Sequence, residues 1–290
     1  MGHLTDAPER NQRDDCQRAN KGGSPMSETF QITLEQAEAY EELLVPAITG
    51  QWAAPMLDLA GVSVGQRVLD VACGTGVLAR AAAERVGPTG HVVGVDLNPA
   101  MLTVASRIRP DLEWREGDAT NLPLEDERFD AALCLSALFF FPDASAAVAE
   151  MARVVRVGGA VVIQTYASLD DQPVYGQFIE TVLRYASEDA RSLIDTYFSQ
   201  GDLPALRGTL ERAGLRVQRT VSPMGVAAYG SWDELIATEV KSTPLVDRLT
   251  DDQLEQIRED MEGLLRQHRA PDGSLKLPIR AHLIAGRRTA

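Results

Sequence analysis

The chain has 290 residues, a hydrophobic fraction of 44% and a formal net charge of −14. This length and apolar content are sufficient for one large α/β domain or two small ones. The negative charge argues against a nucleic acid as substrate, because proteins bind the phosphate backbone mainly through Lys and Arg.

The chain shows no signal for a membrane, an export route or a metal. No stretch reaches the roughly 18 consecutive apolar residues of a spanning helix, and the N-terminus lacks the apolar core of a signal peptide. We therefore expect a cytoplasmic protein. Cys16, Cys73 and Cys134 lack the paired spacing of a zinc site or a disulfide framework, so we expect free thiols and no metal.

The first 28 residues are predicted to form a disordered leader. They are polar, carry charges of both signs and include Gly22-Gly23-Ser24-Pro25. Met1 and Met26 are both possible start residues of the natural protein. Residues 29–290 are predicted to form a single domain.

Helical and strand patterns then follow in chain order. Apolar residues recur at helical spacing up to about residue 60, and Pro46 and Pro55 divide this run, so short N-terminal helices are expected over 29–60. Strands are predicted over 67–72, 91–95, 112–116, 129–135, 160–166, 215–221 and 277–287. Helices are predicted between them over 77–86, 99–107, 144–154 and 203–213. This alternation predicts a doubly wound α/β fold with a mainly parallel sheet, and residues 66–166 form its ligand-binding core.

Two long intervals, 167–200 and 223–275, interrupt the alternation. They contain amphipathic helical stretches, among them 252–268. Insertions between sheet strands are common positions for a cover over an active site. We therefore expect both intervals to form a helical cover.

The most informative motif joins the first strand to its helix. The run from Asp70 to Gly76 reads DVACGTG, in which Ala72, Cys73, Gly74 and Thr75 complete a glycine-bearing loop. By pattern alone, Gly74 and Gly76 also match a dinucleotide fingerprint. Asp70 favours a different ligand, because a carboxylate would repel a pyrophosphate but attract the ammonium and sulfonium groups of S-adenosylmethionine.

Acidic residues also follow the next two strands. Asp96 can accept hydrogen bonds from the two hydroxyls of a ribose, which fits either cofactor. Leu97 and Asn98 then lead into a helix where Met101 is either a contact for an adenine ring or a core residue. In the segment Gly117-Asp118-Ala119, the carboxylate and the next amide suit the edge of an adenine.

Together these motifs resemble the class I S-adenosylmethionine-dependent methyltransferases, in particular methyltransferase type 11 and the ubiquinone and menaquinone C-methyltransferases. The resemblance covers about residues 40–288. It is carried by DVACGTG, VVGVDLNPAML, WREGDATNLPL, FDAALCLSALFFFPD and EMARVVRVGGAVVIQTY. Ala72 replaces the glycine that is usual before Cys73.

The resemblance implies a Rossmann-like seven-stranded sheet in the order 3-2-1-4-5-7-6, with an antiparallel last strand. It also implies that Leu135 or Ser136 places a backbone carbonyl near the methionine ammonium. The expected activity is methyl transfer from S-adenosylmethionine to an oxygen, nitrogen or carbon of a small molecule.

Methyl transfer mainly requires alignment and exclusion of water, so a general base is optional. His282, on the antiparallel last strand, is the candidate base, although a histidine in a strand is more often structural. Candidates for an aromatic acceptor pocket, each of which can instead be a core residue, are Tyr40, Trp52, Phe140, Tyr166 and Tyr229. A nicotinamide-dependent oxidoreductase and a nucleoside-binding module without turnover remain the alternatives.

Overall fold

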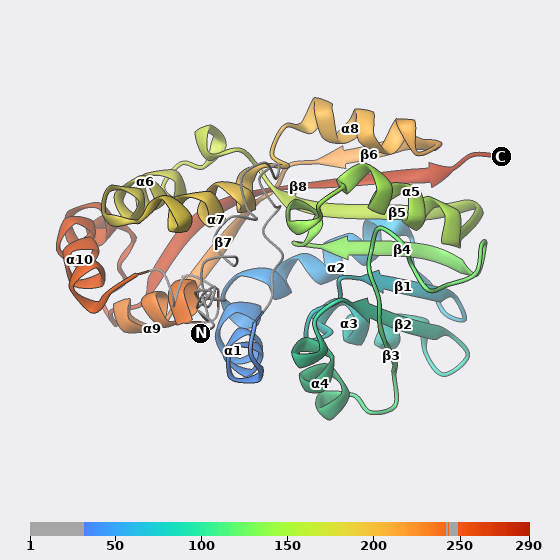
Figure 1. Cartoon of the computed structure of the whole chain (residues 1–290), viewed down its shortest axis with the longest axis horizontal. Coiled ribbons are helices and arrows are strands. Elements are labelled where there is room, and N and C mark those ends of the chain that lie inside the picture. Colours follow the sequence, from blue (N-terminus) through green and yellow to red (C-terminus); the bar gives the residue numbers. More distant parts are fainter. Residues whose placement is uncertain (1–31, 242, 244–248) are drawn as a thin grey trace, which may run out of the picture.

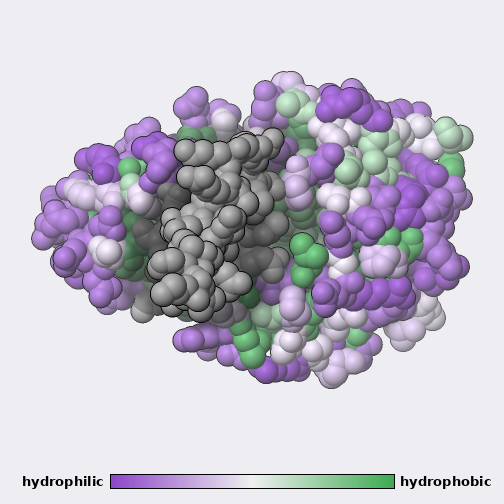
Figure 2. Space-filling model, in the orientation of Figure 1, coloured by the Kyte–Doolittle hydropathy of each residue, from purple (hydrophilic) through white to green (hydrophobic). Residues whose placement is uncertain are grey.

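The computed structural model describes residues 32–241, 243 and 249–290. The predicted leader, residues 1–28, lies outside these described residues. None of the helices in the described ranges has both the length and the apolar character needed to cross a membrane. Hydrophilic residues cover most of the coloured surface over the half of the molecule that contains the sheet (Figure 2).

The first part of the chain forms consecutive helical segments, as the spacing of its apolar residues predicts. They are α1 (Leu34–Ala39), η1 (Tyr40–Thr49), η2 (Gly50–Trp52) and α2 (Ala53–Ala60). Pro46 lies inside η1, which has π-helical hydrogen bonding, whereas Pro55 lies in the first turn of α2. A proline in the first turn is tolerated because the first amides of a helix have no partner within it.

The core then alternates strands and helices. Its elements are β1 (Arg67–Val71), α3 (Val77–Val86), β2 (His91–Asp96), α4 (Pro99–Ile108), β3 (Glu113–Glu116), β4 (Phe129–Leu135), η3 (Leu138–Phe140), α5 (Ala144–Val154) and β5 (Val155–Tyr166). Along β1, Val68 packs into a core cluster with α2 and α3, and Leu69 packs into a second cluster with α5 and α8 (Leu203–Arg212). Alternate side chains of the strand thus bury both faces of the sheet.

The remaining elements complete the sheet and fill the two intervals for which a cover is predicted, and the helices of these intervals are called the cover below. They are η4 (Leu169–Asp171), α6 (Tyr175–Tyr185), α7 (Glu188–Phe198), α8, β6 (Leu215–Val221), β7 (Met224–Tyr229), α9 (Trp232–Ile236), η5 (Ala237–Lys241), α10 (Asp251–Leu265), η7 (Arg266–His268) and β8 (Leu275–Arg288). Helices α6, α7, α9 and α10 gather at one end of the molecule, beside the sheet (Figure 1).

The main sheet has the order β3-β2-β1-β4-β5-β8-β6. The pairs from β3 to β5 are parallel, and β8 is antiparallel to both β5 and β6. β6 is the sixth predicted strand and β8 is the seventh, so the observed order corresponds to the expected 3-2-1-4-5-7-6. The doubly wound fold, the strand order and the antiparallel last strand are therefore confirmed.

The described sheet also has one strand that the sequence did not predict. β7 pairs with the first half of β8, from Leu275 to Arg280, so the interval 223–275 is not purely helical. The inward positions of β7 include Gly225 and Ala227, which are too small to give an apolar alternation. A Cβ on Gly225 would lie 2.4 Å from the indole of Trp52, so the strand lies directly on the N-terminal helices.

Candidate functional site

A cavity of about 190 Å³ lies where β1, β2, β3 and β4 end. The carboxyl ends of parallel strands are the usual place for a ligand in a doubly wound sheet. The structure brings ten of the predicted cofactor-binding residues to this cavity. They are Ala72, Gly74, Asp96, Leu97, Met101, Gly117, Asp118, Ala119, Leu135 and Ser136.

The loop after β1 is shaped by its glycines. Gly74 has a φ of +54° and lines the cavity, where an added Cβ would make only ordinary contacts with Tyr40. Gly76 has a φ of +87°, and its Cβ would come within 2.3 Å of the Trp114 ring. Gly74 therefore leaves room for a ligand against the backbone, whereas Gly76 is required by packing and by the start of α3.

Two other residues of the cavity wall have left-handed backbones without being glycine. Ala72 has a φ of +53° and Ser136 a φ of +51°. Such a conformation costs an L-residue roughly 1–2 kcal/mol, and strain of this kind is concentrated at functional sites. At Ala72 the strain explains why glycine is the more usual residue there.

Asp96 connects two loops at the edge of the cavity. Its Oδ2 accepts a hydrogen bond from the Gly74 amide at 2.7 Å, and its Oδ1 accepts one from the Asn98 amide at 2.8 Å. Burial raises the pKa of Asp96, although these amides oppose the rise. Each carboxylate oxygen has a further lone pair, so Asp96 can still accept hydrogen bonds from two hydroxyl groups of a ligand.

Five of the predicted cofactor residues do not line the cavity. They are Asp70, Cys73, Thr75, Gly76 and Asn98. Asn98 is the N-cap of α4, where its side chain accepts from the Ala100 amide at 2.9 Å. Thr75 donates to Glu41 at 2.5 Å, and Glu41 also forms an ion pair with Arg80 at 2.7 Å. These contacts attach η1 to the glycine loop and so hold one wall of the cavity in place.

Asp70 is buried behind the loop. Its Oδ2 accepts a hydrogen bond from the Ala79 amide at 2.9 Å, while Oδ1 has no partner in the part of the chain that the structure describes. Burial raises the pKa of Asp70 to about 8, with a smaller contribution from the charge of Asp96. An unpaired buried carboxylate oxygen fits a ligand that brings positive charge to this edge of the sheet.

The raised pKa of Asp70 predicts how stability depends on pH without ligand. The group stabilises the fold fully below its unfolded pKa of about 4, and this contribution is lost as the pH rises towards 8. Asp70→Asn keeps an acceptor for Ala79 but cannot ionise. Urea unfolding should therefore show the variant gaining stability relative to wild type between pH 5 and pH 8.

A matched control is Asp111→Asn. Asp111 is exposed and bonded to Arg109, which lowers its pKa to about 2. Its contribution should therefore not change between pH 5 and pH 8. Parallel pH profiles for wild type and Asp70→Asn would contradict the assignment of a raised pKa to Asp70.

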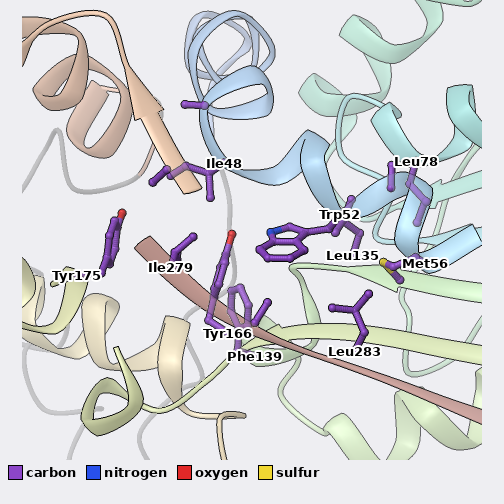
Figure 3. Close-up of a cluster of buried hydrophobic side chains, with 14 of the residues drawn as sticks. Ile48, Trp52, Met56, Leu78, Leu135, Phe139, Tyr166, Tyr175, Ile279 and Leu283 are labelled. Carbon is purple, nitrogen blue, oxygen red and sulfur yellow. The ribbon is translucent and has the colours of Figure 1, made fainter. Parts of the chain in front are cut away.

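The aromatic candidates separate into two groups. Tyr40, Phe140 and Tyr166 line the cavity, but Trp52 and Tyr229 do not. Trp52 packs in the core beside β7. The hydroxyl group of Tyr229 donates at 2.5 Å to Glu239, which does line the cavity. Figure 3 shows Tyr166 and Tyr175 on either side of Ile279, with their hydroxyl groups pointing the same way.

His282 lies outside the cavity. Its Nε2 donates to the Gly201 carbonyl at 3.2 Å, which leaves Nδ1 to accept from the Ser222 hydroxyl at 2.8 Å. Burial also lowers the pKa of His282. His282 pairs with Thr165, the neighbour of the cavity-lining Tyr166, and successive side chains of a strand point to opposite faces, so the position of His282 does not support the predicted role as a base.

Of the wall opposite the strand ends, the sequence predicted only Tyr40, Phe140 and Tyr166. This wall comes from the N-terminal helices, η3, the cover and β8 and includes Leu44, Ile48, Phe139, Phe141, Tyr175, Ile179, Ile194, Tyr197, Phe198, Glu239, Thr243 and Ile279. Glu239 is the one residue of this wall whose position in the sequence could have drawn attention to it. It lies one helical turn after the buried Leu235, on the stripe of the helix that faces the core.

The described residues contain no group of three or more histidine, cysteine or acidic side chains that could hold a metal ion. The side chains at the cavity instead fit an organic ligand. Carboxylates lie beside the strand ends, and the opposite wall is apolar and aromatic.

Comparisons with known proteins agree with this geometry. The sequence pattern of a family described as a methyltransferase domain matches residues 69–163. The ubiquinone/menaquinone biosynthesis C-methyltransferase of Bordetella parapertussis is 31% identical over 217 residues, which cover 70% of this chain and 84% of that protein. The demethylmenaquinone methyltransferase of Renibacterium salmoninarum is 34% identical over 157 residues, which cover 54% of this chain and 63% of that protein.

Solved structures share the fold. The YcgJ protein of Bacillus subtilis has a TM-score of 0.58 at 21% identity, covering 83% of this chain and 99% of that one. A phosphoethanolamine N-methyltransferase of Haemonchus contortus, in complex with phosphomonomethylethanolamine and S-adenosylhomocysteine, has a TM-score of 0.56 at 18% identity. That alignment covers 89% of this chain and 58% of the other.

Proposed function

Because this chain belongs to the class I S-adenosylmethionine-dependent methyltransferases, in the branch of the ubiquinone and menaquinone C-methyltransferases, we propose that it methylates an aromatic small molecule bound in the cavity. One observation carries the proposal: a single cavity has acidic strand-end loops on one side and aromatic side chains on the other. The first side suits a nucleoside with a positively charged sulfur, and the second suits a flat apolar acceptor.

The residues at the strand ends fit S-adenosylmethionine. The cofactor supplies a methyl group on a positively charged sulfur. We assign Asp96 to the ribose hydroxyls and Asp118 with the Ala119 amide to the adenine edge. Gly74 leaves space for the ligand, and Met101 is assigned to the adenine face. Leu135 or Ser136 is assigned to the methionine end, with the buried carboxyl group of Asp70 behind the glycine loop.

The aromatic wall has two tasks in this proposal. It orients the acceptor by contact with its flat faces, and it excludes water from the reacting atoms. The net charge of −14 supports a small molecule rather than a nucleic acid as acceptor. A cytoplasmic location is part of the same proposal.

The alternatives predict different ligands. A nicotinamide-dependent oxidoreductase gains no support from the comparisons, and it would give Asp70 and Asp118 no role. A nucleoside-binding module would bind the same cofactor without turnover. Reduced demethylmenaquinone is a suitable first acceptor, because a relative is named for that compound and the hydroquinone is the electron-rich form.

The test combines calorimetry with a turnover assay. We expect saturable binding of S-adenosylmethionine and S-adenosylhomocysteine and none of NADH. We also expect acceptor-dependent formation of S-adenosylhomocysteine, measured by mass spectrometry, with reduced demethylmenaquinone or another hydroxylated aromatic compound. Binding of NADH without binding of the adenosyl ligands would refute the proposal, and cofactor binding without turnover of any acceptor would favour the binding module.

A further inference from the structure

Glu239 is a carboxylate in an otherwise mainly apolar part of the cavity. It lies in η5, on the cover, and lines the cavity far along the chain from the strand-end loops. Burial raises its pKa, although two hydrogen bonds from tyrosines oppose the rise. A carboxylate in such surroundings is costly unless it is paired, which suggests that it has a partner from outside the chain.

The hydrogen bonds that the structure shows for the Glu239 side chain involve only one of its two carboxylate oxygens. The hydroxyl groups of Tyr175, from α6, and Tyr229, from β7, both donate to Oε1. In the part of the chain that the structure describes, no group donates to Oε2. The side chain is partly exposed and lines the cavity, so Oε2 is the oxygen available to a ligand.

The wall beside this carboxylate is built from aromatic rings. The Phe139 and Phe140 centroids are 4.7 Å apart, and Tyr197 lies 5.4 Å from Phe139 and 5.0 Å from Phe140. Tyr166 lies 6.0 Å from Phe139. Such rings offer contacts to a flat ligand and few hydrogen bonds. Among the described lining residues from η3 and the cover, Glu239 carries the only carboxylate, so it is the strongest hydrogen-bond acceptor that this part of the cavity offers a ligand.

Resting on the proposed function, we infer that Glu239 determines acceptor specificity: its Oε2 accepts a hydrogen bond from a hydroxyl group on the aromatic ring of the acceptor. The chain itself already bonds this carboxylate through two phenolic hydroxyls, and the acceptor supplies a third. An ammonium group fits less well, because it has three N–H donors for the one free oxygen and contacts with ring faces offset only part of its lost hydration, whereas a hydroxyl has a single donor.

The test uses ligands that differ in one group, bound together with saturating S-adenosylhomocysteine so that no chemistry occurs. The probes are 2-naphthol, naphthalene and 2-naphthylmethylammonium, and affinities are measured by fluorescence and calorimetry. A hydrogen bond to a charged group increases affinity by about 10-fold or more. Wild-type protein should therefore bind 2-naphthol at least about 10-fold more tightly than naphthalene.

The decisive variant is Glu239→Gln. The two tyrosine hydroxyls keep the amide oxygen in the place of Oε1, so an NH₂ group takes the place of Oε2 and an acceptor becomes a donor. The preference for 2-naphthol should fall to about 2-fold or less, on the same hydrogen-bond scale, with S-adenosylhomocysteine affinity unchanged. Glu239→Asp should give an intermediate preference, because it keeps the charge on a shorter side chain.

Glu234→Gln is the matched control, since it makes the same change on an exposed position of α9, outside the cavity. It should leave the preference unchanged. No preference in wild-type protein, an undiminished preference in Glu239→Gln, or tighter binding of 2-naphthylmethylammonium than of 2-naphthol would overturn this inference alone. Failure of S-adenosylhomocysteine to bind would instead refute the proposed function.

Discussion

Asp96→Asn should weaken the binding of S-adenosylhomocysteine by roughly 100-fold. The substitution removes the charge that accepts from two ligand hydroxyls, and each hydrogen bond to a charged group contributes about 1.5–3 kcal/mol. It also places an amide NH₂ against the backbone amide of either Gly74 or Asn98, which Asp96 now holds at 2.7 and 2.8 Å. Calorimetric titration measures the change directly.

Asp111→Asn is again a suitable control, because Asp111 is exposed and pairs with Arg109 away from the cavity. It should leave the dissociation constant unchanged. A loss of less than about 5-fold in Asp96→Asn, where each tenfold is about 1.4 kcal/mol, would mean that Asp96 shapes the loop without contacting the ligand.

Gly201→Ala should lower the free energy of unfolding by about 3 kcal/mol, at the upper end of the usual cost of overpacking. An added Cβ would lie 2.2 Å from the amide nitrogen of Ser168 and 2.7 Å from the carbonyl carbon of Ala167. These are backbone atoms, so no side-chain rotation can relieve the clash. The same segment follows α7, which carries Tyr197 and Phe198, and acceptor binding should therefore weaken as well.

Gly263→Ala provides a comparison with the opposite expected sign. Gly263 is exposed inside α10, and no atom lies within 4 Å of its added Cβ. Alanine has a higher helix propensity, so stability should rise by about 0.5–1 kcal/mol. Urea unfolding of both variants checks the prediction, and equal effects would contradict it.

The strand-end loops were predictable because each follows a local rule. Asp70 is the last but one residue of β1 and Asp96 is the last residue of β2, and after each strand a turn and a helix follow within a few residues of sequence. The resemblance then added the strand order, which local patterns cannot give. Local patterns also could not separate Gly74 from Gly76, because their difference depends on Trp114, which comes from another strand.

Apart from Tyr40, Phe140 and Tyr166, the wall opposite the strand ends was not predictable in the same way. Glu239 is bonded by Tyr175 and Tyr229, which lie 64 and 10 positions away along the chain. β7 was not predicted because the small residues Gly225 and Ala227 are buried while the larger apolar residues Met224 and Val226 are exposed, so its sequence shows no buried apolar alternation. His282 was expected at the ligand, but strand pairing alone does not say which face a residue occupies.

β8 joins the two halves of the molecule as one uninterrupted strand of 14 residues (Figure 1). Its first half pairs with β7 under the cover, and its second half pairs with β5 and β6 in the sheet. This has a consequence for recombining relatives to change acceptor choice. A cover taken from a relative has to include residues 275–280 of β8. If the chimera were joined before β8, the β7 of the relative would have to pair with the β8 of this chain, and the register between the two halves would be lost.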